Sequence, residues 1–167
     1  MVFLDNMNHT KVATVSGVSG AGKTTIVKQL AKEFNCPFLL FDDHTDKNTY
    51  PQDMKLWLKS GVNLSQIKTP KLVSSLESLI SETSRPYIFI EEPFGKERNA
   101  MSALIDYVIL LDQPIELCLD RIIRRHTEQA SYDSVSSISN YLDKYEDHFK
   151  DIYISAANQV RNNSDLI

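Results

Sequence analysis

Short apolar runs alternate with longer segments of helical periodicity along this chain. The apolar runs have the length of buried strands and are bounded by turn formers or charges, at Val12–Ser16, Phe38–Phe41, Tyr87–Glu91 and Tyr107–Leu111, with a fifth strand predicted at Leu166–Ile167. Helical patterns cover Lys23–Phe34, Gln52–Ser60, Pro70–Ser81, Lys96–Leu104, Pro114–His126 and Val135–Asn162, the last of which can be bent or broken. Such alternation is typical of βαβ units around a parallel sheet.

The chain length and this order predict one α/β domain over residues 1–167. A chain of 167 residues can bury about 70% of its unfolded surface in a single core. We therefore expect a three-layer sandwich of helices around a mostly parallel, five-stranded sheet.

A glycine-rich segment after the first strand provides the clearest chemical signal. Residues 17–24, GVSGAGKT, match the phosphate-binding pattern GxxxxGK[ST] between a strand and a helix. The loop's N–H groups and the helix N-terminus suit phosphate oxygens, Lys23 suits the β- and γ-phosphates, and the Thr24 hydroxyl suits Mg²⁺. We expect Lys23 to be exposed when the loop is empty. The predicted cofactors are ATP and Mg²⁺, with the nucleotide held by Gly17, Ser19, Gly20, Ala21, Gly22, Lys23, Thr24 and Thr25.

Two acidic pairs follow strands of the predicted sheet. Asp42 and Asp43 close the second strand, at the edge where α/β proteins bind their ligands. A carboxylate there can orient a hydroxyl and accept its proton, although both acids could simply end a strand and cap a turn.

Glu91 and Glu92 follow the apolar residues of the third strand, where a carboxylate can hold Mg²⁺. Strand alternation favours Glu91, and a slip of one residue would make Glu92 the metal ligand instead. Both could also be surface acids.

Three arginines near the end of the fifth predicted helix lie at helical spacing. Arg121 shares a face with Arg124 and Arg125 and could stabilise the moving phosphate. The alternative is a solvated basic helix end that complements the helix dipole. The following residues, HTEQASYDS, read as a mobile loop, so we expect a lid over about residues 121–135.

The chain resembles the uridine kinase and nicotinamide riboside kinase group of P-loop kinases. The likeness lies in GVSGAGKTT, FLLFDDHTDK, YIFIEEPF, IELCLDRIIRRHTE and the closing segment YLDKYEDHFKDIYISAANQVRNNSDLI. It implies a P-loop NTPase fold of the nucleoside and nucleotide kinase type. It also implies that Asp42 is the catalytic base and that Arg121 and Arg124 are the lid arginines. His44 stands where the family has an aromatic residue of the acceptor pocket, and Arg125 stands where it usually has an acid.

The segment of about residues 45–70 is where such a kinase would bind its acceptor. It contains Tyr50 and Trp57, and Trp57 could either stack on a ring of the acceptor or pack in the core. No arginine occurs between Lys47 and Ser84, which favours an uncharged hydroxyl acceptor over a nucleoside monophosphate.

Overall charge and hydropathy exclude several other classes of protein. A net charge of −4 argues against general nucleic-acid binding, and no apolar run is long enough to cross a membrane. The first ten residues lack the pattern of a secretory signal, so we expect a cytoplasmic protein.

The predicted function is transfer of the γ-phosphate of ATP to a hydroxyl of a small molecule, with a nucleoside or riboside as the candidate acceptor. Lys23, Asp42, Arg121 and Arg124 are the candidate catalytic residues, and Thr24, Glu91 and Glu92 are the candidate metal ligands. The alternatives are an ATPase or switch protein without an acceptor, and a nucleoside monophosphate kinase.

Overall fold

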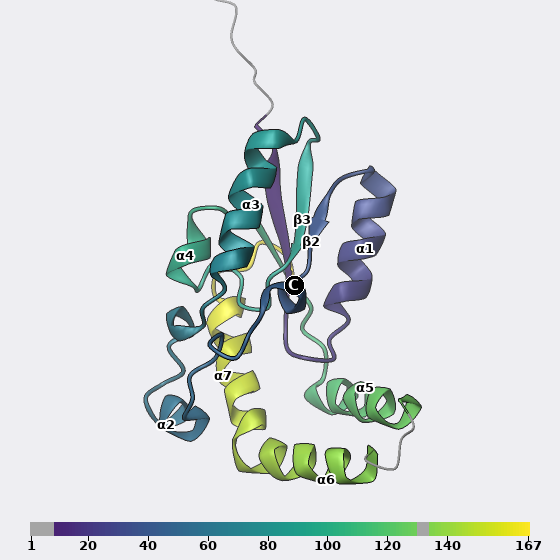
Figure 1. Cartoon of the computed structure of the whole chain (residues 1–167), viewed down its shortest axis with the longest axis vertical. Helices are drawn as coiled ribbons and strands as arrows, with labels where there is room; N and C mark the ends of the chain where they lie inside the picture. The colour runs from purple at the N-terminus through teal and green to yellow at the C-terminus, as the bar shows by residue number, and fades with distance from the viewer. Residues whose placement is uncertain (1–8, 130–133) are drawn as a thin grey trace, which may run out of the picture.

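A parallel sheet forms the centre of the protein (Figure 1). The computed structural model describes residues 9–129 and 134–167. Within them, four strands pair in the order β2-β3-β1-β4, with bounds β1 Lys11–Ser16, β2 Phe38–Leu39, β3 Tyr87–Glu91 and β4 Tyr107–Leu110. The predicted fifth strand was wrong: Leu166 forms a single parallel bridge with Ile109, and the ladder does not extend further in the described residues.

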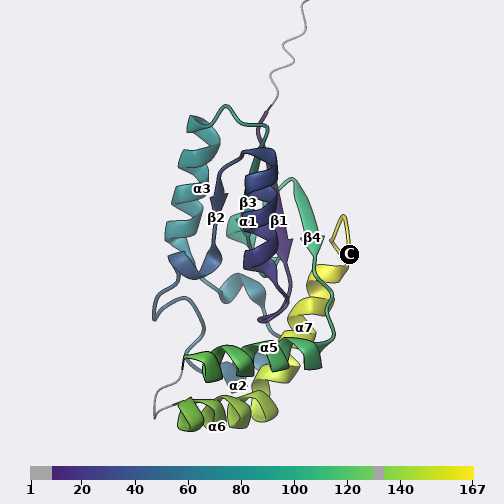
Figure 2. The ribbon, with the colours of Figure 1, turned by 90° about the vertical axis from the view of Figure 1, so that its right-hand side faces the viewer.

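Helices cover both faces of the sheet, as the predicted three-layer architecture requires (Figures 1 and 2). On one face, α3 (Pro70–Glu82), α4 (Asn99–Ser102) and α7 (Lys150–Arg161) bury the larger apolar cluster, which includes Ile88 and Val108 of the strands. On the other face, Val27 and Ala31 of α1 (Lys23–Phe34) pack on β1 and β3. Successive strand residues point to opposite faces, and helices cover both faces, so the strands are buried on both sides.

Two predicted elements are shorter than the sequence pattern suggests. The strand predicted at Phe38–Phe41 ends at Leu39, and the 3₁₀-helix η1 (Phe41–His44) follows. The side chain of His44 closes this turn by a 2.7 Å hydrogen bond between Nδ1 and the Leu40 carbonyl. The helix predicted at Lys96–Leu104 is reduced to α4, because Lys96 belongs to a turn and the extended backbone of Arg98 delays the start of the helix to Asn99.

The last predicted helix is broken. It consists of α6 (Ser134–Lys144), a π-helical segment at Tyr145–Phe149 and α7. Helix α5 (Ile115–Glu128) precedes it and continues through part of the predicted lid loop; residues 130–133 of that loop lie outside the described residues. Figure 2 shows α5 and α6 lying one above the other beyond the carboxyl ends of the strands.

The segment between β2 and α3 contains α2 (Met54–Lys59) and the 3₁₀-helix η2 (Leu64–Gln66). The Asp53 side chain caps α2 by accepting from the Leu56 N–H at 2.9 Å. The helix therefore begins at Met54, later than the predicted Gln52–Ser60 helix. Within residues 9–129 and 134–167, none of the helices is long and apolar enough to cross a membrane.

Candidate active site

The glycine-rich loop joins β1 to α1 and packs directly against α5. Gly20 has a φ of +83°, and a Cβ added there would lie 2.3 Å from the carbonyl oxygen of Cys118 in α5. Gly22 has a φ of +100° and precedes α1, and no side chain caps the first turn of that helix. The N–H groups of this turn are therefore available to an anion, as phosphate binding requires.

Lys23 is buried, which corrects the expectation that it would be exposed in the empty loop. Its residue exposure is 8%, and its Nζ donates a 2.8 Å hydrogen bond to the Val18 carbonyl of the same loop. Burial lowers the pKa of the Lys23 ammonium, while Glu91 and Asp42 oppose this shift. The cation is thus held beside the loop and two carboxylates before any phosphate binds.

The two consecutive glutamates at the end of β3 have different surroundings. Glu91 accepts a 2.6 Å hydrogen bond from the Thr24 hydroxyl at the start of α1. These are the hard oxygen ligands that Mg²⁺ prefers, and they meet where the loop would hold phosphates. The described residues contain no cluster of three or more His, Cys, Asp or Glu side chains, so a cation here would also need phosphate oxygens or water.

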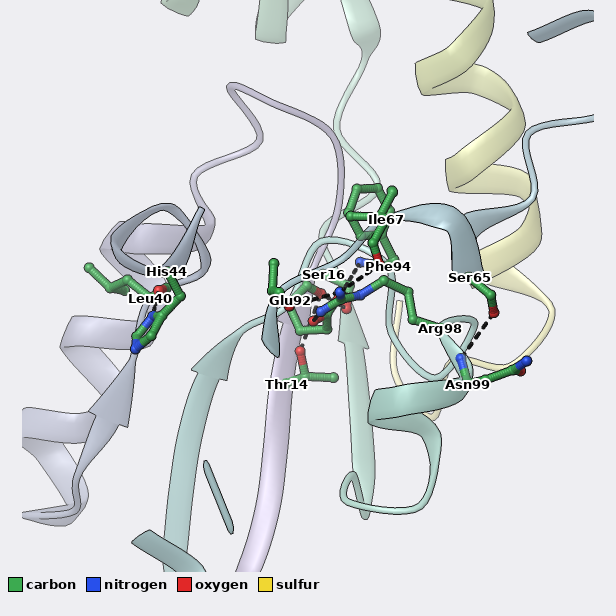
Figure 3. A network of polar contacts seen from close by, with 11 residues as sticks. Thr14, Ser16, Leu40, His44, Ser65, Ile67, Glu92, Phe94, Arg98 and Asn99 are labelled. Carbon is green, nitrogen blue, oxygen red and sulfur yellow. Dashed lines mark hydrogen bonds and ion pairs between the residues drawn. The ribbon is translucent and has the colours of Figure 1, made fainter. Parts of the chain in front are cut away.

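Glu92 points to the opposite side and is fully buried in an ion pair with Arg98 (Figure 3). Arg98 Nε donates to Glu92 Oε1 at 3.1 Å, and Nη2 donates to Oε2 at 2.5 Å. The Phe94 N–H also donates to Oε1 at 3.2 Å. Both carboxylate oxygens of Glu92 are therefore occupied by protein groups, whereas Glu91 faces the glycine-rich loop.

Asp42 lies in the turn η1 and not at the end of a strand. Phe41 before it is buried in the core, which fixes the start of the turn, while Asp42 is exposed. Two cavities border this part of the molecule, and Asp42 and Lys23 line both of them. Asp43 lines neither. The two neighbouring aspartates therefore have different surroundings, and only Asp42 faces the cavities.

A cavity of about 490 Å³ lies between the glycine-rich loop, the segment after β2 and the C-terminal helices. Its walls are rich in aromatic side chains, namely Phe41, Tyr50, Trp57, Phe94, Phe149 and Tyr153. We call it the aromatic cavity. Trp57 is part of the core and its Nε1 donates to the Asn63 carbonyl at 3.0 Å, so it packs in the cavity wall, as the packing alternative predicted. His44 does not line this cavity, because its ring is bonded to Leu40.

Tyr50 contributes a hydroxyl group to the aromatic cavity. The residue is 42% exposed, so part of its ring faces solvent. Partial removal from water, together with Asp42 and Glu92, raises the pKa of Tyr50 to about 12. The hydroxyl therefore keeps its proton at neutral pH.

A second cavity, of about 650 Å³, lies between the glycine-rich loop and α5. Arg121, Arg124 and Arg125 all line it, so the predicted shared arginine face exists; we call it the arginine cavity. Arg121 Nη1 donates to the carbonyls of Gly20 and Ala21, at 3.1 and 3.3 Å. Arg124 is exposed and bonded to Asp120 at 2.8 Å.

The two cavities meet at four shared residues, which are Ser19, Lys23, Asp42 and Glu91. A group in the arginine cavity and a group in the aromatic cavity would both reach this boundary. The boundary combines an ammonium, a carboxylate bonded to a hydroxyl, and a second carboxylate. Two molecules bound in these cavities would have their reacting groups side by side, as phosphoryl transfer needs.

Comparison with known sequences identifies the family of the chain. Residues 16–139 match the family described as an AAA domain, which is a P-loop kinase family. The chain belongs to this family. A search of curated protein sequences found no match to this chain.

Solved structures resemble this AAA domain in fold. A protein provisionally described as a fructose transport system kinase, from Silicibacter sp. TM1040, superposes with a TM-score of 0.57 at 13% identity, over 99% of this chain and 90% of its own. Shikimate kinase from Acinetobacter baumannii gives 0.45 at 17% identity, over 93% and 92% of the two chains. A gluconokinase from Sinorhizobium meliloti 1021 gives 0.44 at 17%, over 93% and 96%. The first similarity establishes the α/β P-loop kinase-like fold.

The sequence did not indicate one wall of the aromatic cavity. Phe149, Ile152 and Tyr153, from the π-helical segment and α7, line it opposite the residues of the β2–α3 segment. The tyrosines and phenylalanine that begin this closing segment were the available signal. Their periodicity alone does not distinguish a cavity wall from an ordinary core face.

Proposed function

We propose that this AAA domain is an ATP-dependent kinase that transfers the γ-phosphate to a hydroxyl of a small, uncharged molecule. The observation that supports this most is the boundary between the two cavities, where Lys23, Asp42 and Glu91 are shared. A hydrolysing switch needs a nucleotide site alone. A second cavity that opens on the same residues is what an acceptor requires.

The nucleotide would bind with its phosphates in the loop formed by Gly17 to Thr25. Lys23 would contact the β- and γ-phosphates when they replace the Val18 carbonyl as its partner. Thr24 and Glu91 would hold Mg²⁺, which when bound neutralises charge on the phosphate oxygens. In this proposal Glu92 is not a metal ligand, because Arg98 and the Phe94 N–H occupy its oxygens.

Asp42 would orient the acceptor hydroxyl and accept its proton as the phosphoryl group is transferred. Its exposed carboxylate at the boundary between the cavities suits this role better than Asp43, which lines neither. Arg121 and Arg124 would stabilise the negative charge that spreads over the transferred phosphate. Arg124 would first have to exchange its exposed Asp120 partner for the phosphate.

The acceptor would carry a planar or apolar ring beside its hydroxyl. The aromatic cavity has a volume of about 490 Å³ and its lining residues are mostly apolar, with Tyr50 as a neutral hydrogen-bond donor. A nucleoside or riboside would satisfy these features. The described lining residues include Lys47 but no arginine for bidentate pairing with a second phosphate, which favours an uncharged acceptor over a nucleoside monophosphate.

An acceptor screen tests this proposal. ADP release from Mg²⁺-ATP is measured with the purified protein alone and with a panel of nucleosides, ribosides, sugars and vitamins. We expect release to depend on one class of hydroxyl compound and the phosphorylated product to appear in equal amount. Release that no compound stimulates, together with a conformational change between ATP and ADP forms, would instead favour the switch.

A further inference from the structure

Arg98 is the most buried cation of the described residues and lies outside both cavities. Its side chain is 1% exposed, and the guanidinium makes two bonds to Glu92. Its Nη1 also donates to the Ile67 carbonyl at 3.2 Å and to the Thr69 hydroxyl at 2.8 Å. The charged network in Figure 3 therefore joins the end of β3 to the residues that precede α3.

On the nucleotide side, the same network is bonded to the start of the glycine-rich loop. The hydroxyls of Ser16 and Thr14 donate to the Glu92 carbonyl, at 2.6 and 3.3 Å. The Gly17 N–H donates to the Pro93 carbonyl at 3.2 Å. Glu92 is thus fixed to the strand from which the loop begins.

On the acceptor side, Arg98 also contacts the residue before Asp42. Its guanidinium carbon lies 5.4 Å from the centre of the Phe41 ring. The Phe41 ring packs edge-on against the Phe94 ring, with 5.7 Å between the ring centres. The segment that begins at Phe41 and ends at Thr69 forms one wall of the aromatic cavity. Arg98 holds both ends of that segment.

Stability alone does not account for a charged pair at this position. A buried ion pair is often no more stable than apolar residues of similar volume, because both charges must leave water. An arginine does offer a planar fork with several donors in fixed directions, which lysine lacks. Here the guanidinium contacts three separate parts of the chain at once: Glu92, the segment of Ile67 and Thr69, and the ring of Phe41.

We propose that Arg98, paired with Glu92, is a positioning residue that fixes the acceptor-binding wall and Asp42 relative to the glycine-rich loop. This inference rests on the proposed kinase function. In this proposal Arg98 aligns the acceptor hydroxyl with the phosphate and contacts neither substrate.

The test uses two variants of the full chain and a matched control. Arg98→Lys keeps the charge and removes the fork. The double variant Glu92→Met with Arg98→Met removes both charges, so no buried charge is left unpaired and we expect the fold to be preserved. Arg85→Lys is the control, because Arg85 is exposed and lies two residues before β3 begins at Tyr87, at the opposite end of the strand from Glu92.

Kinetics at a temperature where every variant is fully folded gives the first readout. Misplacement of a reacting group by about 1 Å can cost about 10²-fold, so we expect acceptor kcat/KM to fall by about tenfold or more in both variants. The Kd for ATP should stay within about twofold of wild type, since the loop itself is unchanged. Wild-type acceptor kinetics in the double variant would overturn the proposal, and so would an equal loss of ATP affinity.

Amide hydrogen exchange of residues 41–69 gives a second readout that does not depend on turnover. Faster exchange there in both variants, with Arg85→Lys like wild type, is the expected result. If the wild-type protein phosphorylates no acceptor, the kinase proposal itself has failed, and this readout alone decides whether Arg98 fixes the segment. Unchanged exchange in both variants would then contradict the inference.

Discussion

The Thr24 hydroxyl donates a 2.6 Å hydrogen bond to the Glu91 carboxylate, which connects the start of α1 to the end of β3. The next residue, Glu92, points away from this contact and pairs with Arg98. Consecutive residues of a strand face opposite sides, so two identical acids receive different surroundings. One is available for a cation beside the phosphates, and the other is part of the buried framework.

The two glutamates should respond differently to the same substitution. Glu91→Gln should raise the Mg²⁺ concentration needed for half-maximal turnover by about tenfold or more, with little change in stability, because a carboxylate charge near the metal is lost. Glu92→Gln should lower the free energy of unfolding by about 2 to 4 kcal/mol, because Arg98 loses its buried counter-charge. Mg²⁺ titrations and denaturant unfolding measure the two effects. Similar, mild effects of both substitutions would contradict the assignment.

Lys23 should be required for turnover and dispensable for folding. Lys23→Ala removes the cation proposed to contact the phosphates, and we expect turnover to fall by about 10²-fold or more. Because burial disfavours its charged form, stability should be unchanged or slightly higher. Turnover and thermal unfolding are compared with Lys28→Ala, an exposed lysine of the same helix. A strongly destabilised Lys23→Ala protein would show that this lysine is a structural residue.

Substitutions at two glycines distinguish the cost of steric contact from the cost of backbone strain. Gly20 and Gly61 both have positive φ, +83° and +95°, but only at Gly20 would a Cβ meet another atom, the Cys118 carbonyl at 2.3 Å. Gly61→Ala should cost about 1 to 2 kcal/mol and leave ATP binding unchanged. Gly20→Ala should cost more and also abolish ATP binding, since the loop must move away from α5. Unfolding and binding of a fluorescent ATP analogue measure both effects; equal effects of the two variants would refute close packing of the loop on α5.

The raised pKa of Tyr50 predicts that wild type and Tyr50→Phe lose unfolding free energy to different extents at alkaline pH. Its folded pKa of about 12 exceeds the ordinary value of 10.0, so between these values the folded protein binds more protons than the unfolded chain. Its contribution to stability is therefore complete below pH 10 and is lost as the pH rises toward 12. Tyr50→Phe should reduce the fall in unfolding free energy over this interval. Identical pH profiles for the variant and wild type would show that Tyr50 titrates normally.

The sequence predicted those features that depend on short-range patterns. The glycine-rich loop, the bounds of α1 and β3 and the proximity of Glu91 to the loop follow from a local motif and from strand alternation. The fifth strand failed because, of its two predicted residues, only Leu166 pairs with the sheet, in a single bridge to Ile109. Element bounds after β2 shifted because the side chain of His44 and the buried Phe41 favour a turn.

Long-range polar contacts could not be predicted in the same way. Arg98 follows Glu92 by a short turn, yet its other partners, Ile67 and Thr69, are about 30 residues earlier in the chain. No periodicity encodes such a pairing. The burial of Lys23 depends likewise on packing around the loop. The cytoplasmic location stays a prediction from the sequence.

The most direct test of the kinase proposal is to compare acceptor-dependent ADP release by wild type, Asp42→Asn and Asp43→Asn, with ATP binding measured separately. If Asp42 accepts the acceptor's proton, Asp42→Asn should lower kcat by about 10²- to 10⁴-fold, the usual contribution of a general base, with ATP affinity nearly unchanged. Asp43→Asn, whose side chain lines neither cavity, should retain wild-type kinetics. If Asp42→Asn keeps more than about half of the acceptor-dependent rate, Asp42 is not the base and the account of this site is contradicted.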